Sequence, residues 1–207
     1  PQPIDPAFAA AVDEAVAHLG SDTAAATLAE DGYWPKWDGP WWQMRLLWEL
    51  GLHHRIPERA ARSLVASLQA RMYPGFPFSL DDVPPGFDKE RGTGCHCQLG
   101  TMYEVLGACG VAMDLELPWV RSWFLRYQLP DGGLNCDEAV YLRPDPHASV
   151  VSTLPALEAV LAAPPPLAPA EEAFLARGAS YLLQRRLHRS RSLGTPIDAA
   201  WLLPTFP

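Results

Sequence analysis

The stretch LPWVRSWFLRYQLPDGGLNCDEAVYLRPDPH, residues 117–147, contains the pattern that decides the fold. Its first part, residues 117–129, is predicted to be an amphipathic outer helix. The sequence Asp131-Gly132-Gly133 then predicts a tight turn, because glycine permits left-handed backbone dihedrals and aspartate accepts amide hydrogen bonds. The loop that follows contains Cys136, and His147 is expected at the start of the next helix.

A repeat with a long period runs outward from this stretch in both directions. Gln69, Gln128 and Gln184 each close an amphipathic segment, and they are spaced 59 and 56 residues apart. Each unit pairs a nearly uncharged inner helix with an amphipathic outer helix, which is typical of stacked helical hairpins. No stretch with period-two alternation between hairpin turns indicates a strand. We therefore predict an all-α fold in which residues 1–207 form one domain, an α/α toroid or an open arc of one, with about three hairpin repeats.

The boundaries of the expected helices come from apolar spacing and from proline and glycine at their ends. An amphipathic helix at 7–19 and a short helical piece at 21–28 come first. Inner helices are then expected at 41–50, 95–109 and 147–162, and outer helices at 58–72, 117–129 and 171–187. The segment 73–94 is rich in proline and glycine, so it is predicted to be a long functional or mobile loop.

Composition limits the class of protein and its partners. Hydrophobic residues make up 48% and charged residues 19% of the 207, as in ordinary globular domains. The net charge of -8 disfavours nucleic acid as a partner, and the basic run at 185–191 is interpreted as a solvated helix end. No apolar run is long enough for a membrane span and no signal peptide is evident, so a cytoplasmic protein is expected. The first residue is Pro1, which suggests that the true start has been trimmed.

The turn sequence also carries a family resemblance. Residues 128–133, QLPDGG, resemble the Q-x-x-D-G-G-W repeat signature of the squalene cyclase and protein prenyltransferase superfamily, with Leu134 in place of the usual Trp. The repeat extends this resemblance over nearly the whole chain, most closely at 97–191, and the chain looks most like bacterial stand-alone proteins with prenyltransferase and squalene-oxidase type repeats. The resemblance implies a toroid and an isoprenoid- or terpenoid-related enzyme, with zinc-dependent transfer or cyclisation as its chemistry. The alternative is a non-catalytic module that binds a lipid or a partner.

Three residues at equivalent phases of consecutive hairpins predict a metal site. Cys97 lies near the start of an inner helix, Cys136 in the loop before the next one, and His147 where that helix is expected to begin. Two thiolates and an imidazole are ligands that tetrahedral zinc selects. Protein prenyltransferases hold zinc with Asp, Cys and His, so the resemblance implies Asp137 as the fourth ligand.

Other interpretations of these residues stay open. Cys95 and His96 are rival ligands from the same turn, and the cysteines can also be small core residues. Near the loop in sequence, only Arg91, Arg126 and Arg143 could bind a diphosphate, which favours a structural metal, or no metal, over metal-assisted transfer.

The cyclase alternative lacks an acid where the resemblance requires one. Protonating terpene cyclases carry a D-x-D-D motif at an inner-helix start, and residues 147–153 contain no Asp or Glu. Aromatic side chains can still line an apolar cavity for an isoprenoid or other lipid, and the residues selected for this role are Trp41, Trp42, Tyr103 and Trp123. The same aromatics can equally be core packing.

The end of an open arc would expose the side of its last hairpin. Because exposed apolar faces are usually covered, we expect either a homodimer or a chain that is a fragment of a longer one.

Overall fold

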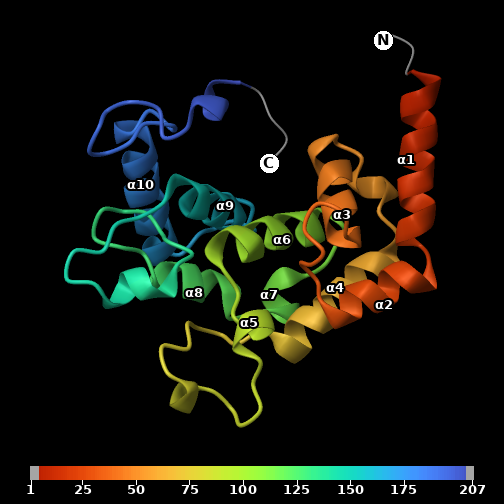
Figure 1. The fold of residues 1–207 in the computed structure, drawn as a ribbon, viewed down its shortest axis with the longest axis horizontal. Helices are drawn as coiled ribbons and strands as arrows, with labels where there is room; N and C mark the ends of the chain where they lie inside the picture. The colour runs from red at the N-terminus through yellow and green to blue at the C-terminus, as the bar shows by residue number, and fades with distance from the viewer. Residues whose placement is uncertain (1–4, 204–207) are drawn as a thin grey trace. The chain divides into compact units, whose positions relative to one another are not determined.

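The computed structural model describes residues 5–203, apart from the side chain of Leu80. Within this range the protein is all-α and has no β-strand, only isolated bridges such as the one between Leu134 and Ser149 (Figure 1). The prediction of an all-α fold is therefore confirmed. None of the helices in residues 5–203 is long and apolar enough to cross a membrane.

The helices largely follow the segments that the sequence predicts. Most of them start and end within three residues of the expected positions. The α-helices of the described chain are α1 (Pro6–Leu19), α2 (Asp22–Glu30), α3 (Pro40–Glu49), α4 (Glu58–Arg71), α5 (Lys89–Gly92), α6 (His96–Ala108), α7 (Met113–Glu116), α8 (Val120–Arg126), α9 (Val150–Leu161) and α10 (Pro169–Gln184). Four 3₁₀ turns accompany them: η1 (His53–Arg55), η2 (Leu80–Asp82), η3 (Glu138–Leu142) and η4 (Ala199–Leu202).

Local chemistry explains where several helices begin. The Asp5 carboxylate accepts from the backbone N–H of Ala7 at 2.8 Å, and Pro6 occupies the first helical position of α1. The Ser21 hydroxyl caps α2 in the same way. At α10 the Glu171 carboxylate reaches back to the N–H of Ala168 at 2.8 Å. These caps satisfy amide groups that have no partner inside the helix.

Two of the expected boundaries are different in the structure. The outer helix expected at 117–129 is the shorter α8, preceded by the single turn α7. His147 does not begin a helix, because α9 starts at Val150 and the residues before it are extended. The segment 73–94 is a long loop as predicted, and it contains η2 and the single turn α5.

Contacts divide the chain into two compact units. Unit 1 comprises residues 5–94 and 101–120, and unit 2 comprises residues 95–100 and 121–203. In unit 1, α2 packs against α4 and α1 packs against α3, while in unit 2, α9 packs against α10. The first turn of α6 therefore belongs to unit 2 and the rest of α6 to unit 1. The single-domain toroid stays a prediction, because two compact units can belong to one domain.

The QLPDGG turn connects α8 to α10 in unit 2. The Gln128 amide nitrogen donates to the carbonyl of Gly132 at 2.7 Å and to the carbonyl of Phe174 in α10 at 2.9 Å. Gly132 has a φ of 96°, a left-handed conformation that glycine adopts without strain. A Cβ at Gly132 would also lie 2.5 Å from the Arg177 carbonyl oxygen. The turn is therefore built against the backbone of α10.

The second glycine of the turn is required by packing. A Cβ at Gly133 would lie 2.5 Å from the Ala148 Cβ, 2.7 Å from the Thr153 Oγ1 and 3.0 Å from the Tyr181 ring. Asp131 fastens the same region, since its carboxylate accepts from the N–H of Gly133 at 3.3 Å and from the N–H of Ala148 at 3.1 Å. The turn thus also fixes the segment that leads into α9.

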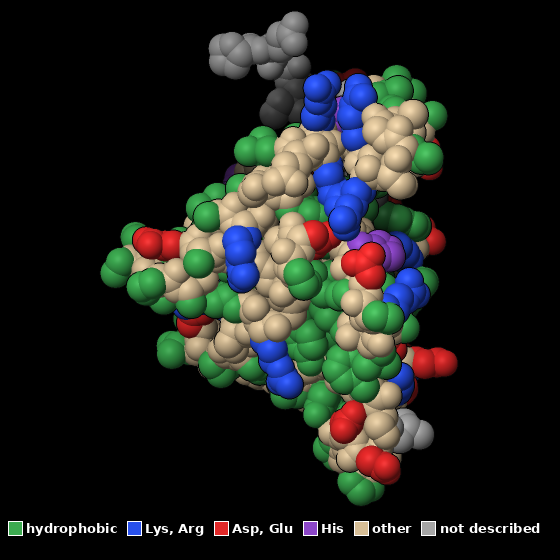
Figure 2. All heavy atoms as spheres, turned by 90° about the vertical axis from the view of Figure 1, so that its left-hand side faces the viewer, with side chains coloured by type: hydrophobic (Ala, Val, Ile, Leu, Met, Phe, Trp, Pro, Cys, Tyr) green, Lys and Arg blue, Asp and Glu red, His purple; other side chains and the backbone are tan. Residues whose placement is uncertain are grey.

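Unit 2 keeps many large apolar side chains on its surface. Hydrophobic side chains are widespread on the face of the molecule in Figure 2. The most exposed ones in unit 2 are Leu142, Leu161, Leu183, Leu187, Leu193, Leu202 and Leu203. Surfaces of this kind are often covered by a partner. The homodimer and the longer chain stay predictions.

Gly133→Ala is expected to destabilise the protein by about 1–3 kcal/mol, because the added methyl group overpacks the contact between the turn, α9 and α10. Urea denaturation followed by circular dichroism measures this change. Gly107→Ala is the control, since a Cβ at Gly107 in α6 meets no atom within 4 Å. The control should be neutral or stabilise by up to about 1 kcal/mol. If Gly133→Ala and the wild type were equally stable, this result would contradict the close packing described around Gly133.

Candidate metal centre

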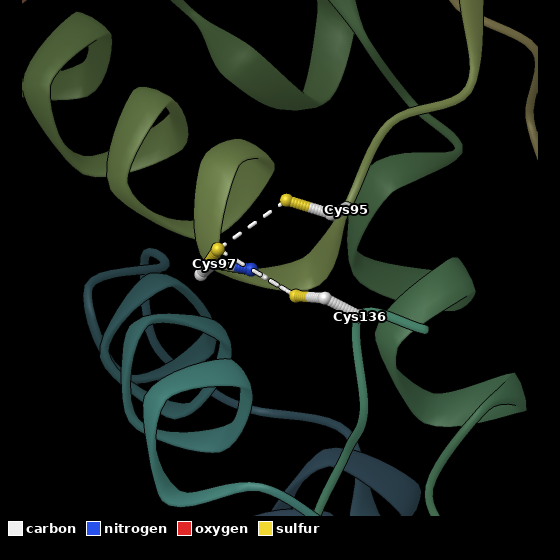
Figure 3. Close-up of side chains that lie close together, drawn as sticks. All are labelled: Cys95, Cys97 and Cys136. Atoms are coloured by element: carbon white, nitrogen blue, oxygen red, sulfur yellow. Dashed lines mark hydrogen bonds between the residues drawn. The ribbon is translucent and has the colours of Figure 1, made fainter. Parts of the chain in front are cut away.

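Three cysteines from two segments of unit 2 bring their sulfur atoms together. Cys95 directly precedes α6, Cys97 lies in its first turn, and Cys136 follows the QLPDGG turn. The Sγ atoms of Cys95 and Cys97 are 3.3 Å apart, those of Cys97 and Cys136 are 3.5 Å apart, and all three lie within 4.8 Å of one another. Figure 3 shows the three side chains converging on one point. We call these residues the thiol cluster.

Hydrogen bonds hold the segment of Cys136 against the start of α9. The N–H of Ser149 donates to the Leu134 carbonyl at 2.8 Å, and the N–H of Leu134 donates to the Thr153 hydroxyl at 2.9 Å. The N–H of Cys136 donates to the Ser152 hydroxyl at 3.0 Å. Two hydroxyls of α9 thus fix the backbone that presents Cys136.

The first turn of α6 is held close to the same helix. A Cβ at Gly100 would lie 2.5 Å from the backbone of Pro155 in α9, so only glycine permits this approach. The N–H of Cys97 points at Cys136 and donates to its sulfur at 3.4 Å. Contacts with α9 therefore position both segments that carry the cysteines of the cluster.

His96, the first residue of α6, lies between Cys95 and Cys97 in sequence and is fully buried. Its Nδ1 is 2.8 Å from the Asn135 carbonyl oxygen, and because a carbonyl can only accept, Nδ1 carries the proton. The ring stacks on Trp123 with centroids 4.3 Å apart. A histidine that donates from one nitrogen to a carbonyl has the other nitrogen in the form that binds metals.

The three thiols hold their protons unequally. Hydrogen bonds with Cys95 and Cys97 lower the pKa of Cys136 well below its ordinary value, and the neighbouring His96 lowers it further. The hydrogen bond with Cys136 raises the pKa of Cys97 to about 12 and raises the pKa of Cys95 well above its ordinary value. Cys136 is therefore the member of the cluster that loses its proton most readily, and Cys95 and Cys97 hold theirs more tightly.

The donor set and the spacing of the cluster suit zinc. A tetrahedral zinc ion with Zn–S bonds of about 2.3 Å holds its sulfur ligands about 3.8 Å apart. The distances in the cluster, 3.3 and 3.5 Å with an upper limit of 4.8 Å, lie around that value. Three thiolates exclude hard cations such as magnesium and calcium, which prefer oxygen ligands.

The structure brings together two of the four metal ligands expected from the sequence. Cys97 and Cys136 are in the cluster, and Cys95, the rival from the same turn, is the third member. In the sequence, only the Cys-x-Cys spacing indicates that Cys95 could be a ligand. This spacing does not determine which of the two thiols faces Cys136.

The other two expected ligands are outside the thiol cluster. Asp137 begins η3, where its carboxylate accepts from the N–H of Ala139 at 3.0 Å, and it lies 3.7 Å from the Arg143 guanidinium. His147 lines a pocket on unit 2, and its carbonyl accepts from the Asn135 amide. Metal binding by Asp137 and His147 stays a prediction.

Cys109 is separate from the cluster. It follows the last turn of α6, and burial raises the pKa of its thiol. Cys109 is therefore not a candidate ligand of the thiol cluster.

The aromatic residues selected as cavity lining are all buried. Trp42 packs against Trp37 with ring centroids 4.3 Å apart, and its Nε1 donates to the Tyr33 carbonyl at 3.0 Å. The Tyr103 hydroxyl donates to Asp114 at 2.7 Å. The four residues, which are 2–5% exposed, are Trp41, Trp42, Tyr103 and Trp123. These contacts are those of core side chains, and a role in ligand binding stays a prediction.

No family model, no curated protein and no solved structure matches this chain. Arguments about its function therefore depend on the geometry of its own residues.

Zinc affinity is expected to rise steeply from about pH 6 to about pH 8, because the protons on Cys95 and Cys97 must leave before both thiols bind metal. Below the pKa values of these thiols, each proton that zinc displaces raises the zinc affinity about tenfold per pH unit. Two displaced protons therefore raise the affinity by at most about 100-fold per pH unit. Calorimetric titration with a competing chelator, in two buffers of different ionisation enthalpy, measures the number of protons released. Release of fewer than about one proton per zinc ion would contradict the assignment of two thiols.

Proposed function

We propose that this chain is a helical zinc-binding protein whose thiol cluster, Cys95, Cys97 and Cys136, holds the ion. The observation that carries the proposal is the convergence of three sulfur atoms within 4.8 Å of one another. Cysteines that serve only as small apolar residues have no reason to face one another around a shared proton network. Three facing thiols, one of which has a lowered pKa, are prepared for a cation.

The proposed role of the ion is structural. The cluster joins the first turn of α6 to the segment after the QLPDGG turn, two segments that are 39 residues apart along the chain. A metal bound to both stabilises the folded state, because the separated ligands of the unfolded chain bind it far less well. When bound with an open coordination position, zinc also supplies a Lewis acid. The half-buried position of all three cysteines supports the structural role.

His96 is the residue from which we propose the fourth ligand. His96 is among the groups that lower the pKa of Cys136, so its ring lies near that thiol. Its Nδ1 proton is held by Asn135, the arrangement that orients metal-binding histidines. The variant His96→Gln distinguishes two possible sites, one with three thiolates and one imidazole and the other with three thiolates and water. Only the first of these sites loses a ligand in the variant.

A second proposal follows from the family resemblance: an isoprenoid-related enzyme or lipid-binding protein in an α/α toroid or an open arc. The QLPDGG turn supports it, because Gln128, Asp131 and both glycines connect α8, α9 and α10 through specific contacts. The aromatic residues proposed to contact the ligand are Trp41, Trp42, Tyr103 and Trp123.

We expect one zinc ion per chain in protein purified without chelators, measured by mass spectrometry of the metals. Cys97→Ser and Cys136→Ser should weaken zinc binding by more than the about 10–100-fold that loss of a mere supporting residue costs. Cobalt in place of zinc should give thiolate-to-metal charge-transfer absorption, which reports the sulfur ligands directly.

Cys109→Ser is the matched control, because it removes a thiol of the same chain that lies outside the cluster. It should keep one zinc ion and the same cobalt spectrum. A wild-type protein that takes up no zinc or cobalt, or a spectrum unchanged in Cys136→Ser, would show that the cluster is not a metal site.

The isoprenoid proposal predicts that farnesol quenches or shifts the tryptophan fluorescence of the protein in a saturable manner, because buried indoles would contact the ligand. Trp41→Phe should weaken this binding, whereas Trp34→Phe, which changes an exposed indole outside the four selected residues, should not. A linear, non-saturable response to farnesol would count against an isoprenoid site.

A further inference from the structure

A basic depression lies at the C-terminal end of α10, away from the residues of the thiol cluster. Two pockets of about 680 Å³ and about 520 Å³ share Tyr181, Arg185, Ser190 and Arg191, so they are two lobes of one depression. We call it the arginine pocket. Each lobe has a volume within the range of small-molecule sites. All of its lining residues belong to unit 2.

The charge of this depression is opposite to that of the whole chain. Its lining includes the four residues Arg185, Arg186, Arg189 and Arg191, against Asp131 and Asp145. The chain as a whole has a net charge of -8. Figure 2 shows Lys and Arg side chains gathered at the upper end of the face it presents, at the height of the loops after α10 in Figure 1. A local positive charge in a concave surface attracts anions.

Only one of the four guanidinium groups is compensated. Arg185 lies 3.6 Å from the Asp131 carboxylate, and its guanidinium stacks over the Tyr181 ring at 4.3 Å. In residues 5–203, no carboxylate forms an ion pair with Arg186, Arg189 or Arg191. The basic run is therefore not only a solvated helix end, because part of it is gathered around a pocket.

Arg189 has a buried donor that requires an acceptor. Its Nη1 donates to the Gly194 carbonyl at 2.8 Å, which holds the guanidinium in place. Its Nε is buried and has no hydrogen-bond partner among the described residues. Buried donors without an acceptor are rare in folded proteins, and each requires a physical cause. Because this Nε is buried, a ligand in the pocket would contact Arg189 through its terminal guanidinium nitrogens.

The loop that carries these arginines is well defined. Arg186 and Leu187 have φ values of 47° and 66°, left-handed conformations that cost non-glycine residues about 1 kcal/mol or more each. The N–H of Ser190 donates to the Thr195 carbonyl at 2.8 Å, and the N–H of Ile197 donates to the His188 carbonyl at 2.8 Å. These bonds return the chain toward α10 and hold Arg189 and Arg191 near Tyr181.

The wider lobe adds an apolar wall to the basic one. It is lined by Val150 and Val151 at the start of α9 and by Ile197 and Trp201 of the C-terminal segment. Trp201 is 38% exposed, so its ring is accessible to a ligand. An anion with an apolar or aromatic part would contact both walls at once.

We propose that the arginine pocket binds a small organic phosphate, with the phosphate held by Arg189 and Arg191 and its apolar part against Trp201. Guanidinium groups form paired, charge-assisted hydrogen bonds with phosphate oxygens, and several of them together match its charge. The neutral Tyr181 hydroxyl adds a donor, because burial raises the pKa of this phenol to about 12. This inference does not depend on the thiol cluster or on zinc.

Phenyl phosphate, inorganic phosphate and phenol are the probes for calorimetric titration in a buffer of low ionic strength. Phenyl phosphate is expected to bind with a Kd of about 1 mM or lower, more tightly than inorganic phosphate, and phenol is expected not to bind. Trp201→Ala should remove the advantage of phenyl phosphate and leave the binding of inorganic phosphate unchanged.

Arg191→Gln is the main variant, because Arg191 is exposed and its removal leaves the loop contacts in place. It should weaken binding of both phosphates by about tenfold, the effect of losing about 1.4 kcal/mol. Arg189→Gln should have an effect of at least the same size. Arg143→Gln is the matched control, since it removes the same charge from unit 2 outside the pocket and should leave the affinity unchanged.

Three results would overturn the proposal: no binding of either phosphate at about 10 mM, equal weakening in Arg143→Gln and Arg191→Gln, or equal affinity for phenyl phosphate and phenol. Circular dichroism of each variant confirms that it is folded. Because zinc content is measured separately, failure of this proposal is distinguishable from failure of the metal site.

Discussion

The close approach of the QLPDGG turn to α9 and α10 is the constraint on which unit 2 depends. Neither Gly132 nor Gly133 has space for a Cβ, and the groups that would be met are the backbone of α10 and side chains of α9. Gln128 adds a hydrogen bond from the turn to the carbonyl of Phe174. Because the backbone packs so closely at these two glycines, neither helix can shift without a clash. The turn therefore determines where α9 and α10 lie relative to α8.

Both candidate sites are attached to this one turn. On its C-terminal side the chain continues directly to Leu134 and Cys136, which α9 fixes through hydroxyl groups. On its other side Asp131 accepts from the N–H of Ala148 and pairs with Arg185 at the arginine pocket. The thiol cluster and the arginine pocket are therefore separate in chemistry but share a scaffold. A substitution in the turn would disturb both, whereas a substitution within one site would leave the other intact.

The sequence predicted most helices correctly, because apolar spacing and terminal proline and glycine depend only on local residues. It also selected Cys97 and Cys136, which the structure brings together with Cys95. It could not place His147, which lines the arginine pocket, because Ala148 and Ser149 separate it from the start of α9. It interpreted the basic run as solvated, because the return of that loop toward Tyr181 depends on hydrogen bonds between residues that the local pattern does not relate.

The sequence by itself determined the all-α class, the glycine turn and the residue types available for a metal site. These properties follow from periodicity, backbone freedom and side-chain chemistry, which each residue carries with it. Only the tertiary structure decided which cysteine joins Cys97 and Cys136, and which arginines surround a pocket. Those choices depend on distances between segments distant in the chain, and such distances are set by how closely the glycines of the turn let the helices pack.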